Sequence, residues 1–376
     1  MAPVSSGRSA YRLWLDEGYE GTIQDFFRWL QGPMGKQGPP GEKGDAGERG
    51  PRGWPGGGGG GLGTALGPGE PNGFEDYTDA TLSFDDATRT LTVTGPASVW
   101  ADGQRFQVSS ATFQISDVEG DHFVYFDRDG SLAEIDTFDV GIIREKAFVA
   151  YIYWDADNGQ AVPGLICETH GATMDGATHE YLHTTNGTAY LGGLDLAAID
   201  IEGNGNDDTS AQFTASAGSI WDEDIKHAFS GRAATDTIPV LWREGPEGVW
   251  RMDDAGAYPV LKGADRAYWN EWTGSTWQRT EAASNDYVLA HIWAVPGLNY
   301  DAGRFVAMMG QGDYLTRAAA RAGALTEFSS LSTGSLPTKE FVAVGTFIFQ
   351  TVTNYTNAVA ARIVTTEAGE DFVDFR

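Results

Sequence analysis

The sequence predicts a mainly β homotrimer. A short N-terminal helix and a collagen-like triple helix are expected to precede β-sandwich or jelly-roll-like domains with one or two helices. Glycine stands at every third position of residues 32–59, short runs alternate apolar and polar residues from residue 72 onward, and one long helical pattern lies near 314–328. The predicted organisation is an N-terminal segment 1–31, a stalk with a glycine linker 32–61, a β-rich domain 72–175 and further β-rich structure over 176–376.

The regular spacing of its glycines predicts the stalk. Between them stand mostly Pro, Lys, Glu, Asp and Arg, in triplets such as Gly38-Pro39-Pro40. Only glycine fits at the axis where three polyproline II chains meet, so a strict Gly-X-Y repeat indicates three chains. A flexible linker is the alternative, but a linker needs no fixed spacing, and it fits only the glycine run 56–61. The stalk glycines are Gly32, Gly35, Gly38, Gly41, Gly44, Gly47, Gly50 and Gly53.

The segment before the stalk is predicted to contain a short amphipathic helix. Thr22 is a suitable N-cap, and apolar residues recur at helical spacing from Ile23 to Leu30. A helix of this length is marginal alone. We therefore expect it to register the three chains or to dock into a larger assembly, and its aromatic density favours docking. The expected anchor residues are Trp14, Phe26, Phe27, Trp29 and Leu30.

Alternating residues in the body predict antiparallel strands. Residues 81–94 form a hairpin pattern around Asp85-Asp86, and 122–126 and 148–154 are longer strand patterns. Short strands separated by Gly and Asp turns indicate a sandwich or jelly-roll type of architecture. The alanine-rich helix near 314–328 follows Gly312-Asp313 as a possible cap.

Composition excludes several classes of protein. A net charge of −28 makes a basic surface for nucleic acid or anionic membranes hard to form. Cys167 is the sole cysteine, so no intrachain disulfide forms. The start has no signal-peptide pattern, and no apolar run is long enough to span a membrane. We therefore expect synthesis and folding in a cytosol, which, for a collagen-like stalk, points to a virus particle assembled inside a bacterium.

Several motifs resemble one family. Ser9, Trp14-Leu15, Gly21-Thr22 and Asp25-Phe26, running directly into Gly-X-Y triplets, look like the start of bacteriophage tail-fibre and other virion fibre proteins. Body phrases such as 167–171, 219–225 and 372–376 are similar to the body of these proteins. The resemblance implies a virion-proximal N-terminus that binds other virion proteins, and a structural role for the body. Whether Arg376 lies at a free tip or against a partner is left open.

One motif raises the possibility of metal chemistry. His179-Glu-Tyr-Leu-His183 matches H-E-x-x-H, which requires both histidines on one helix face, the glutamate as general base and a third ligand. The residues after His183 do not extend a helical pattern, and the next histidine is His227. A structural metal site of His170, His179 and His183 is a second alternative. Packed or hydrogen-bonded histidines are the favoured interpretation, so we expect no catalytic residue, no cofactor and no bound metal.

Two further groups have a functional and a structural interpretation. Asp222-Glu-Asp224 could form an acidic site, but a solvated edge or a helix start is favoured. Trp269, Trp272 and Trp277 could stack against a host glycan, whereas dense tryptophans also fill β cores and trimer interfaces.

The sequence thus predicts a trimeric structural fibre or appendage of a tailed-phage virion that helps attachment to the host surface. It is expected to be no enzyme, to bind other virion proteins, to bind no nucleic acid and to insert into no membrane; a host glycan is the partner that the tryptophan alternative implies. One alternative is a head- or neck-attached decoration fibre without a receptor role. The other is a fibre-borne metal-dependent hydrolase that uses His179, Glu180 and His183.

Overall fold

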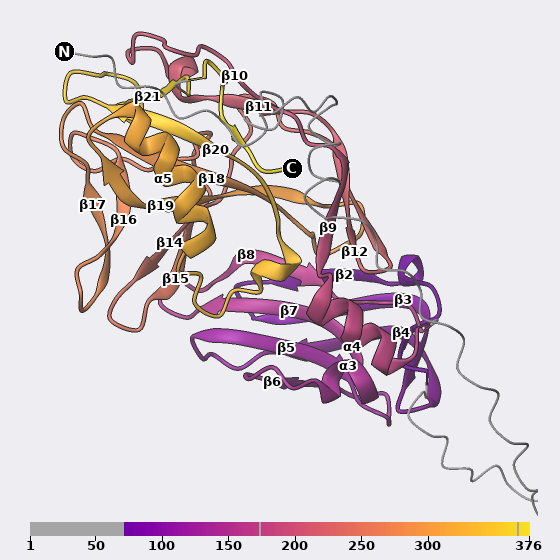
Figure 1. The fold of residues 1–376 in the computed structure, drawn as a ribbon. Helices are drawn as coiled ribbons and strands as arrows, with labels where there is room; N and C mark the ends of the chain where they lie inside the picture. Colours follow the sequence, from indigo (N-terminus) through magenta and orange to yellow (C-terminus); the bar gives the residue numbers. More distant parts are fainter. Residues whose placement is uncertain (1–70, 173, 367) are drawn as a thin grey trace, which may run out of the picture. The chain divides into compact units, whose positions relative to one another are not determined.

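The computed structural model describes residues 71–172, 174–366 and 368–376. The predicted anchor and stalk residues lie outside this range. The described residues belong to one compact unit, Thr64–Arg376, and the predicted mainly β fold is confirmed for them (Figure 1). None of their helices has both the length and the apolar character needed to cross a membrane. The predicted boundary between residues 175 and 176 stays a prediction.

Two four-stranded antiparallel sheets come first along the chain. One has the order β1-β3-β2 with β4 beside β3, and the other has the order β6-β5-β7-β8. The predicted hairpin over 81–94 is present, with Asp85 opposite Thr90. The strands are β1 (Gly73–Phe74), β2 (Thr81–Asp85), β3 (Thr90–Ala101), β4 (Gln104–Gln114), β5 (Gly120–Phe126), β6 (Leu132–Ile135), β7 (Ala147–Asp155) and β8 (Gln160–Cys167).

A seven-stranded sheet follows later in the chain. Its order is β15-β14-β19-β18-β20-β21 with β22 beside β20, and only the pairing of β14 with β19 is parallel. Helix α5 lies over this sheet in Figure 1. The elements are β14 (Val240–Glu244), β15 (Val249–Asp253), β18 (Tyr287–Val295), β19 (Arg304–Tyr314), α5 (Arg317–Ser330), β20 (Val342–Thr351), β21 (Ala361–Val364) and β22 (Val373–Asp374).

Smaller elements connect and cover these sheets. Strands β13-β12-β9 form a three-stranded sheet, and β10-β11 and β16-β17 form two-stranded ones. The elements are η1 (Tyr77–Asp79), α3 (Gly141–Glu145), α4 (Gly176–Thr185), β9 (Thr188–Gly193), β10 (Leu196–Ala198), η2 (Asp208–Ala211), β11 (Phe213–Ala215), β12 (Gly218–Asp222), β13 (Ile225–Phe229), β16 (Tyr268–Trp272), β17 (Trp277–Glu281) and η3 (Thr338–Glu340).

Strand β7 is buried on both faces. All nine of its residues are buried, which explains why its sequence is almost continuously apolar rather than alternating. On one face, Ile152 and Trp154 share a core with Leu91 of β3. On the other face, Tyr151 and Tyr153 share a core with strands of the seven-stranded sheet. The sheet that contains β7 is therefore a middle layer.

The long helix begins three residues later than predicted. Tyr314 ends strand β19, where it pairs with Tyr287 of β18, and its hydroxyl donates to a carboxylate oxygen of Glu327 at 2.6 Å. Thr316, not Gly312-Asp313, caps the helix by accepting from the Ala319 amide at 3.1 Å. The part of the chain that is described has three α-helices where one or two were expected, because α3 and α4 carry weak apolar patterns.

The contact of Tyr153 with Trp250 gives a test of the packing between the layers. The buried Trp250 amide donates to the Tyr153 hydroxyl oxygen at 3.0 Å. Tyr153→Phe leaves this buried amide without its partner, so we expect the free energy of unfolding to fall by about 1–3 kcal/mol, measured by urea denaturation. The matched control is Tyr190→Phe, at an exposed tyrosine whose hydroxyl donates to the Gly193 carbonyl. Equal stabilities for the two variants would contradict the expectation.

Candidate functional site: a histidine–carboxylate cluster beside an aromatic pocket

Four histidines and five carboxylates gather where the end of β8, helix α4, the β12–β13 hairpin and η3 meet. The sequence places these groups up to 172 positions apart, and only the fold unites them. We call this group the histidine–carboxylate cluster. Its members are Glu168, His170, His179, His183, Asp222, Glu223, Asp224, His227 and Glu340.

The segment that follows β8 is fixed by strand β1. The Phe74 amide donates to the His170 carbonyl at 2.8 Å, and the Ala172 amide donates to the Phe74 carbonyl at 2.7 Å. Gly73 has φ +108°, and a Cβ there would collide with the His170 carbonyl oxygen. Glycine at this position thus permits the close approach that holds His170 in place.

Helix α4 presents two histidines on one face. Asp175 caps it, accepting from the Ala177 and Thr178 amides at 3.1 and 3.0 Å. His179 and His183 are four residues apart, so their side chains lie one above the other. His179 Nε2 lies 3.0 Å from one oxygen of Glu223, and His183 Nδ1 lies 3.2 Å from the other. The H-E-x-x-H motif therefore does lie on a helix, as its chemistry requires.

The glutamate of that motif lies elsewhere. Glu180 forms an ion pair with Arg144 of α3, and the Arg144 side chain is half exposed. A zinc-peptidase base has to reach a water molecule at the metal, whereas this carboxylate is engaged by a guanidinium. The motif thus supplies its two histidines to the cluster but not its glutamate.

The β12–β13 hairpin supplies the acidic residues. Glu223 and Asp224 form the turn between paired Asp222 and Ile225, and Glu223 has the left-handed φ of 50°. The Asp222 and Glu223 side chains are fully buried. The expectation that this acidic run is a solvated edge is therefore wrong, because the hairpin tip folds inward against α4 and the segment after β8. A non-glycine residue in this conformation stores strain, which is common at functional sites.

Asp224 orients His170. Its carboxylate accepts from His170 Nδ1 at 2.7 Å and from the Gly171 amide at 2.8 Å. The other ring nitrogen, Nε2, lies 3.4 Å from Glu168 Oε2. Burial alone would lower the pKa of His170, but the contacts with Asp224 and Glu168 raise it well above its ordinary value. Carboxylates thus lie at both ring nitrogens of His170.

The other carboxyl groups respond to burial in different ways. Burial, reinforced by the charges of Asp222 and Glu168, raises the pKa of Glu340 well above its ordinary value. Burial alone would also raise the pKa of Glu223, but the contacts with His179 and His183 outweigh it and lower this pKa to about 2. The contacts with the two histidines thus favour the ionised form of Glu223.

Many polar atoms of the cluster have no hydrogen-bond partner. Short separations, such as those between Glu223 and the two histidines of α4, lack hydrogen-bond alignment. Unpartnered buried polar groups are costly and rare in folded proteins. The unpartnered atoms here are Glu168 Oε2, His170 Nε2, His179 Nε2, His183 Nδ1, Asp222 Oδ2, both carboxylate oxygens of Glu223 and both ring nitrogens of His227.

Two overlapping sets of donors are close enough to hold a metal ion. The donor atoms of His170, His179 and Glu223 lie within 4.8 Å of one another, and so do those of Glu168, His170 and Asp222. Imidazole nitrogens with carboxylate oxygens suit zinc-like transition metals. Cys167 is adjacent in sequence, but burial raises the pKa of its thiol to about 11 and its Sγ lies 3.0 Å from Thr169 Oγ1.

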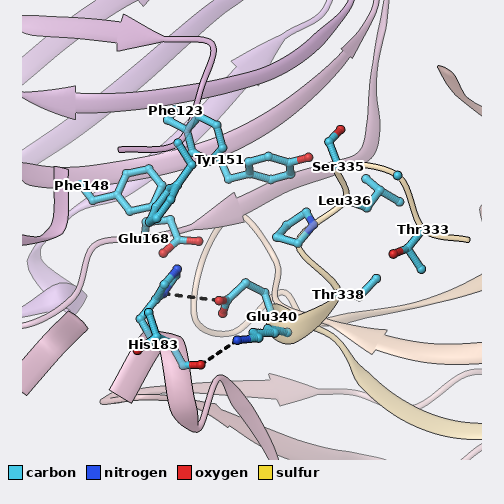
Figure 2. Close-up of a pocket in the computed structure, with 15 residues that line it drawn as sticks. Phe123, Phe148, Tyr151, Glu168, His183, Thr333, Ser335, Leu336, Thr338 and Glu340 are labelled. Carbon is cyan, nitrogen blue, oxygen red and sulfur yellow. Dashed lines mark hydrogen bonds and ion pairs between the residues drawn. The ribbon is translucent and has the colours of Figure 1, made fainter. Parts of the chain in front are cut away.

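A pocket of about 420 Å³ opens beside the cluster (Figure 2). Phe123, Phe148 and Tyr151 form an aromatic wall, and residues 333–340 form the opposite side. A third side carries the ionisable groups of Glu168, His183 and Glu340, with His183 Nδ1 lying 3.4 Å from Glu340 Oε1. Phe138, which is 40 % exposed, stacks on the His183 ring with centroids 5.6 Å apart. The pocket thus combines aromatic faces with buried hydrogen-bonding groups.

The three candidate tryptophans do not share one surface. Trp272 and Trp277 are cross-strand neighbours with ring centroids 5.4 Å apart, but Trp277 is 9 % exposed and lies under Arg243. Trp269 packs against a hydrophobic core to which strands of the seven-stranded sheet contribute side chains. Trp272, which is 45 % exposed, offers the most accessible face of the three.

Three of the nine cluster residues were predictable from the sequence as metal candidates. His170, His179 and His183 are brought together as that alternative required, while Glu168 and Glu340 were missed because neither stands in a metal-binding motif. The signal for the remaining carboxylates was the Asp222-Glu-Asp224 run, interpreted as solvated. Comparisons with family models, with curated proteins and with solved structures find no match for this chain.

His227 predicts a pH dependence of stability. Burial lowers its pKa from 6.5 to about 4, against the opposing charge of Asp222. Below pH 6.5 this histidine is protonated in the unfolded chain but stays neutral in the folded protein. The free energy of unfolding therefore decreases as the pH falls from 6.5 to 4. We expect this loss to reach about 3 kcal/mol and to be absent in His227→Gln. Urea denaturation in EDTA at several pH values measures it, and parallel pH profiles for both proteins would refute it.

Proposed function

We propose that this protein is a trimeric structural fibre of a tailed-bacteriophage virion. Its N-terminal segment attaches to other virion proteins, a collagen-like stalk joins three chains, and the β-rich body, made of sandwich or jelly-roll-type domains, helps attachment to the host surface. The observation that carries the proposal is the glycine at every third position from Gly32 to Gly53, since that repeat has a function only when three chains wind together.

The body has features that support this role. Two four-stranded sheets pack through one core, and the middle sheet packs against a third, which suits a rigid domain held at the end of a stalk. Three copies per fibre and several fibres per particle would turn weak contacts into firm attachment. The pocket beside the cluster supports contact with a sugar-like ligand, because aromatic walls and buried polar groups are the usual lining of small-ligand sites.

The stalk predicts the assembly state. We expect the 376-residue chain to assemble to three times its mass of 40.4 kDa by analytical ultracentrifugation. Gly44→Val places a side chain at the axis of the triple helix, so the melting midpoint of the stalk, followed by circular dichroism, should fall.

The matched control for this variant is Gly57→Val. Gly57 lies in the glycine run, out of step with the stalk glycines, so its substitution should leave the midpoint unchanged. A monomer at micromolar concentration, or equal effects of the two substitutions, would overturn the trimeric stalk.

The pocket predicts where the body contacts a host. Phe138→Ala removes an aromatic face at the pocket rim, and one lost aromatic contact should weaken adsorption of the fibre to host cells by up to roughly tenfold. Leu325→Ala is the control, because Leu325 is similarly exposed but lies on α5. Fluorescently labelled fibre incubated with host cells measures the effect, and equal adsorption of both variants would exclude this pocket as the contact.

A fibre-borne metal-dependent hydrolase is the second candidate. His179 and His183 on one helix face, beside a pocket with several carboxylates, favour it. The ion pair of Glu180 with Arg144 counts against the peptidase form of that chemistry. Incubating the zinc-loaded protein with host cell-wall and capsule material separates the two, since released fragments would identify an enzyme.

A decoration fibre without a receptor role needs the same stalk and anchor. Images of the intact particle with an antibody bound to the body distinguish it from a tail fibre, because they show where on the virion the protein protrudes.

A further inference from the structure

We propose that the histidine–carboxylate cluster binds one divalent transition-metal ion of the zinc class through His170, His179 and Glu223. This inference goes beyond the proposed fibre function. It rests on three donors that come from three separate elements and lie within 4.8 Å of one another.

The donors are buried, and each has at least one atom without a hydrogen bond. His170 Nδ1 lies 3.9 Å from Glu223 Oε2 and is also hydrogen-bonded to Asp224. His170 is 2 % exposed and His179 is 7 % exposed, and the Glu223 side chain has no exposure at all. His170 Nε2, His179 Nε2 and both Glu223 oxygens are unpartnered. Two ligands of a tetrahedral zinc, each about 2.0–2.1 Å from the metal, are separated by about 3.3–3.4 Å. The 3.0 Å separation of His179 Nε2 from Glu223 Oε2 is close to that value.

The neighbouring groups resemble the outer shell of a metal site. Ligating histidines usually donate their second ring nitrogen to a carboxylate or a carbonyl. His170 has such a partner in Asp224, which is itself held by the Gly171 amide. His183 lies 3.2 Å from the second oxygen of Glu223 and is placed to orient this carboxylate.

The charge of the cluster favours a cation. Five carboxyl groups lie within one buried region, and an unpaired buried carboxylate is strongly unfavourable. A dication would lower their mutual repulsion and tie together the segment after β8, helix α4 and the β12–β13 hairpin. Nitrogen donors select zinc-like ions over Ca²⁺ and Mg²⁺, which prefer oxygen ligands alone.

The test uses the full-length protein without an affinity tag. After dialysis against EDTA, we expect Zn²⁺ to bind with about one ion per chain in a competition titration with a chromogenic chelator, and Co²⁺ to give the visible absorption of a tetrahedral site. His179→Ala should weaken Zn²⁺ binding by more than roughly 100-fold, and Asp224→Asn by roughly 10–100-fold. Asp224→Asn keeps the assay informative if His179→Ala does not fold.

The matched control is Glu180→Gln. It lies next to His179 on the same helix but pairs with Arg144, so Zn²⁺ affinity should not change. Absence of binding at micromolar Zn²⁺, or unchanged affinity in His179→Ala, would overturn the proposal. Loss of binding in Asp222→Asn but not in His179→Ala would also overturn it, because the ion would then belong to Glu168, His170 and Asp222. Since binding is measured per chain, the result is independent of whether the protein forms a trimer.

Discussion

Burial of one sheet on both of its faces is the constraint on which the described fold depends. Strand β7 has no exposed residue, so the sheet β6-β5-β7-β8 has to be covered twice. One cover is the sheet that contains β3, and the other is the seven-stranded sheet. Close packing on two sides leaves little freedom in where the strands end. The last residues of β8 therefore have a fixed position, and the segment that contains Glu168 and His170 begins there.

The cluster follows from that fixed point. Strand β1 holds the His170 backbone by hydrogen bonds, and Asp175 caps helix α4 a few residues later. The β12–β13 hairpin packs against both of these segments. Each of these devices is ordinary by itself. Together they bring several ionisable groups into a region where water is largely excluded, and a protein that needed only stability would gain more from apolar side chains there. The cluster is consequently better explained by a function than by packing.

Local patterns in the sequence predicted the local structure well. Alternation predicted the hairpin over 81–94, because side chains of a strand point to opposite faces. Short, mostly apolar runs predicted the strands near 122–126 and 148–154, which are buried more evenly. The start of α5 was misplaced because Tyr314 is apolar enough to suit a helix, yet it is paired with Tyr287 in a strand. The cluster was predicted only in part. Its histidines are close in sequence, but Glu340 comes from a distant 3-10 turn, and no local pattern encodes long-range contacts of that kind.

The acidic hairpin shows why residue type alone did not predict the burial of residues 222–224. A run such as Asp222-Glu-Asp224 is usually solvated, because charged side chains are rarely buried without partners. Here the partners are histidines from a different part of the chain. The acidic side chains can therefore be buried only once the tertiary structure has brought these histidines close. The left-handed backbone of Glu223 also indicates that its side chain matters, because glycine and asparagine adopt this conformation more readily than glutamate. The carboxylate of Glu223 lies 3.0 Å from His179 Nε2 and 3.2 Å from His183 Nδ1, and this contact, rather than the conformation of the turn, accounts for a glutamate at that position.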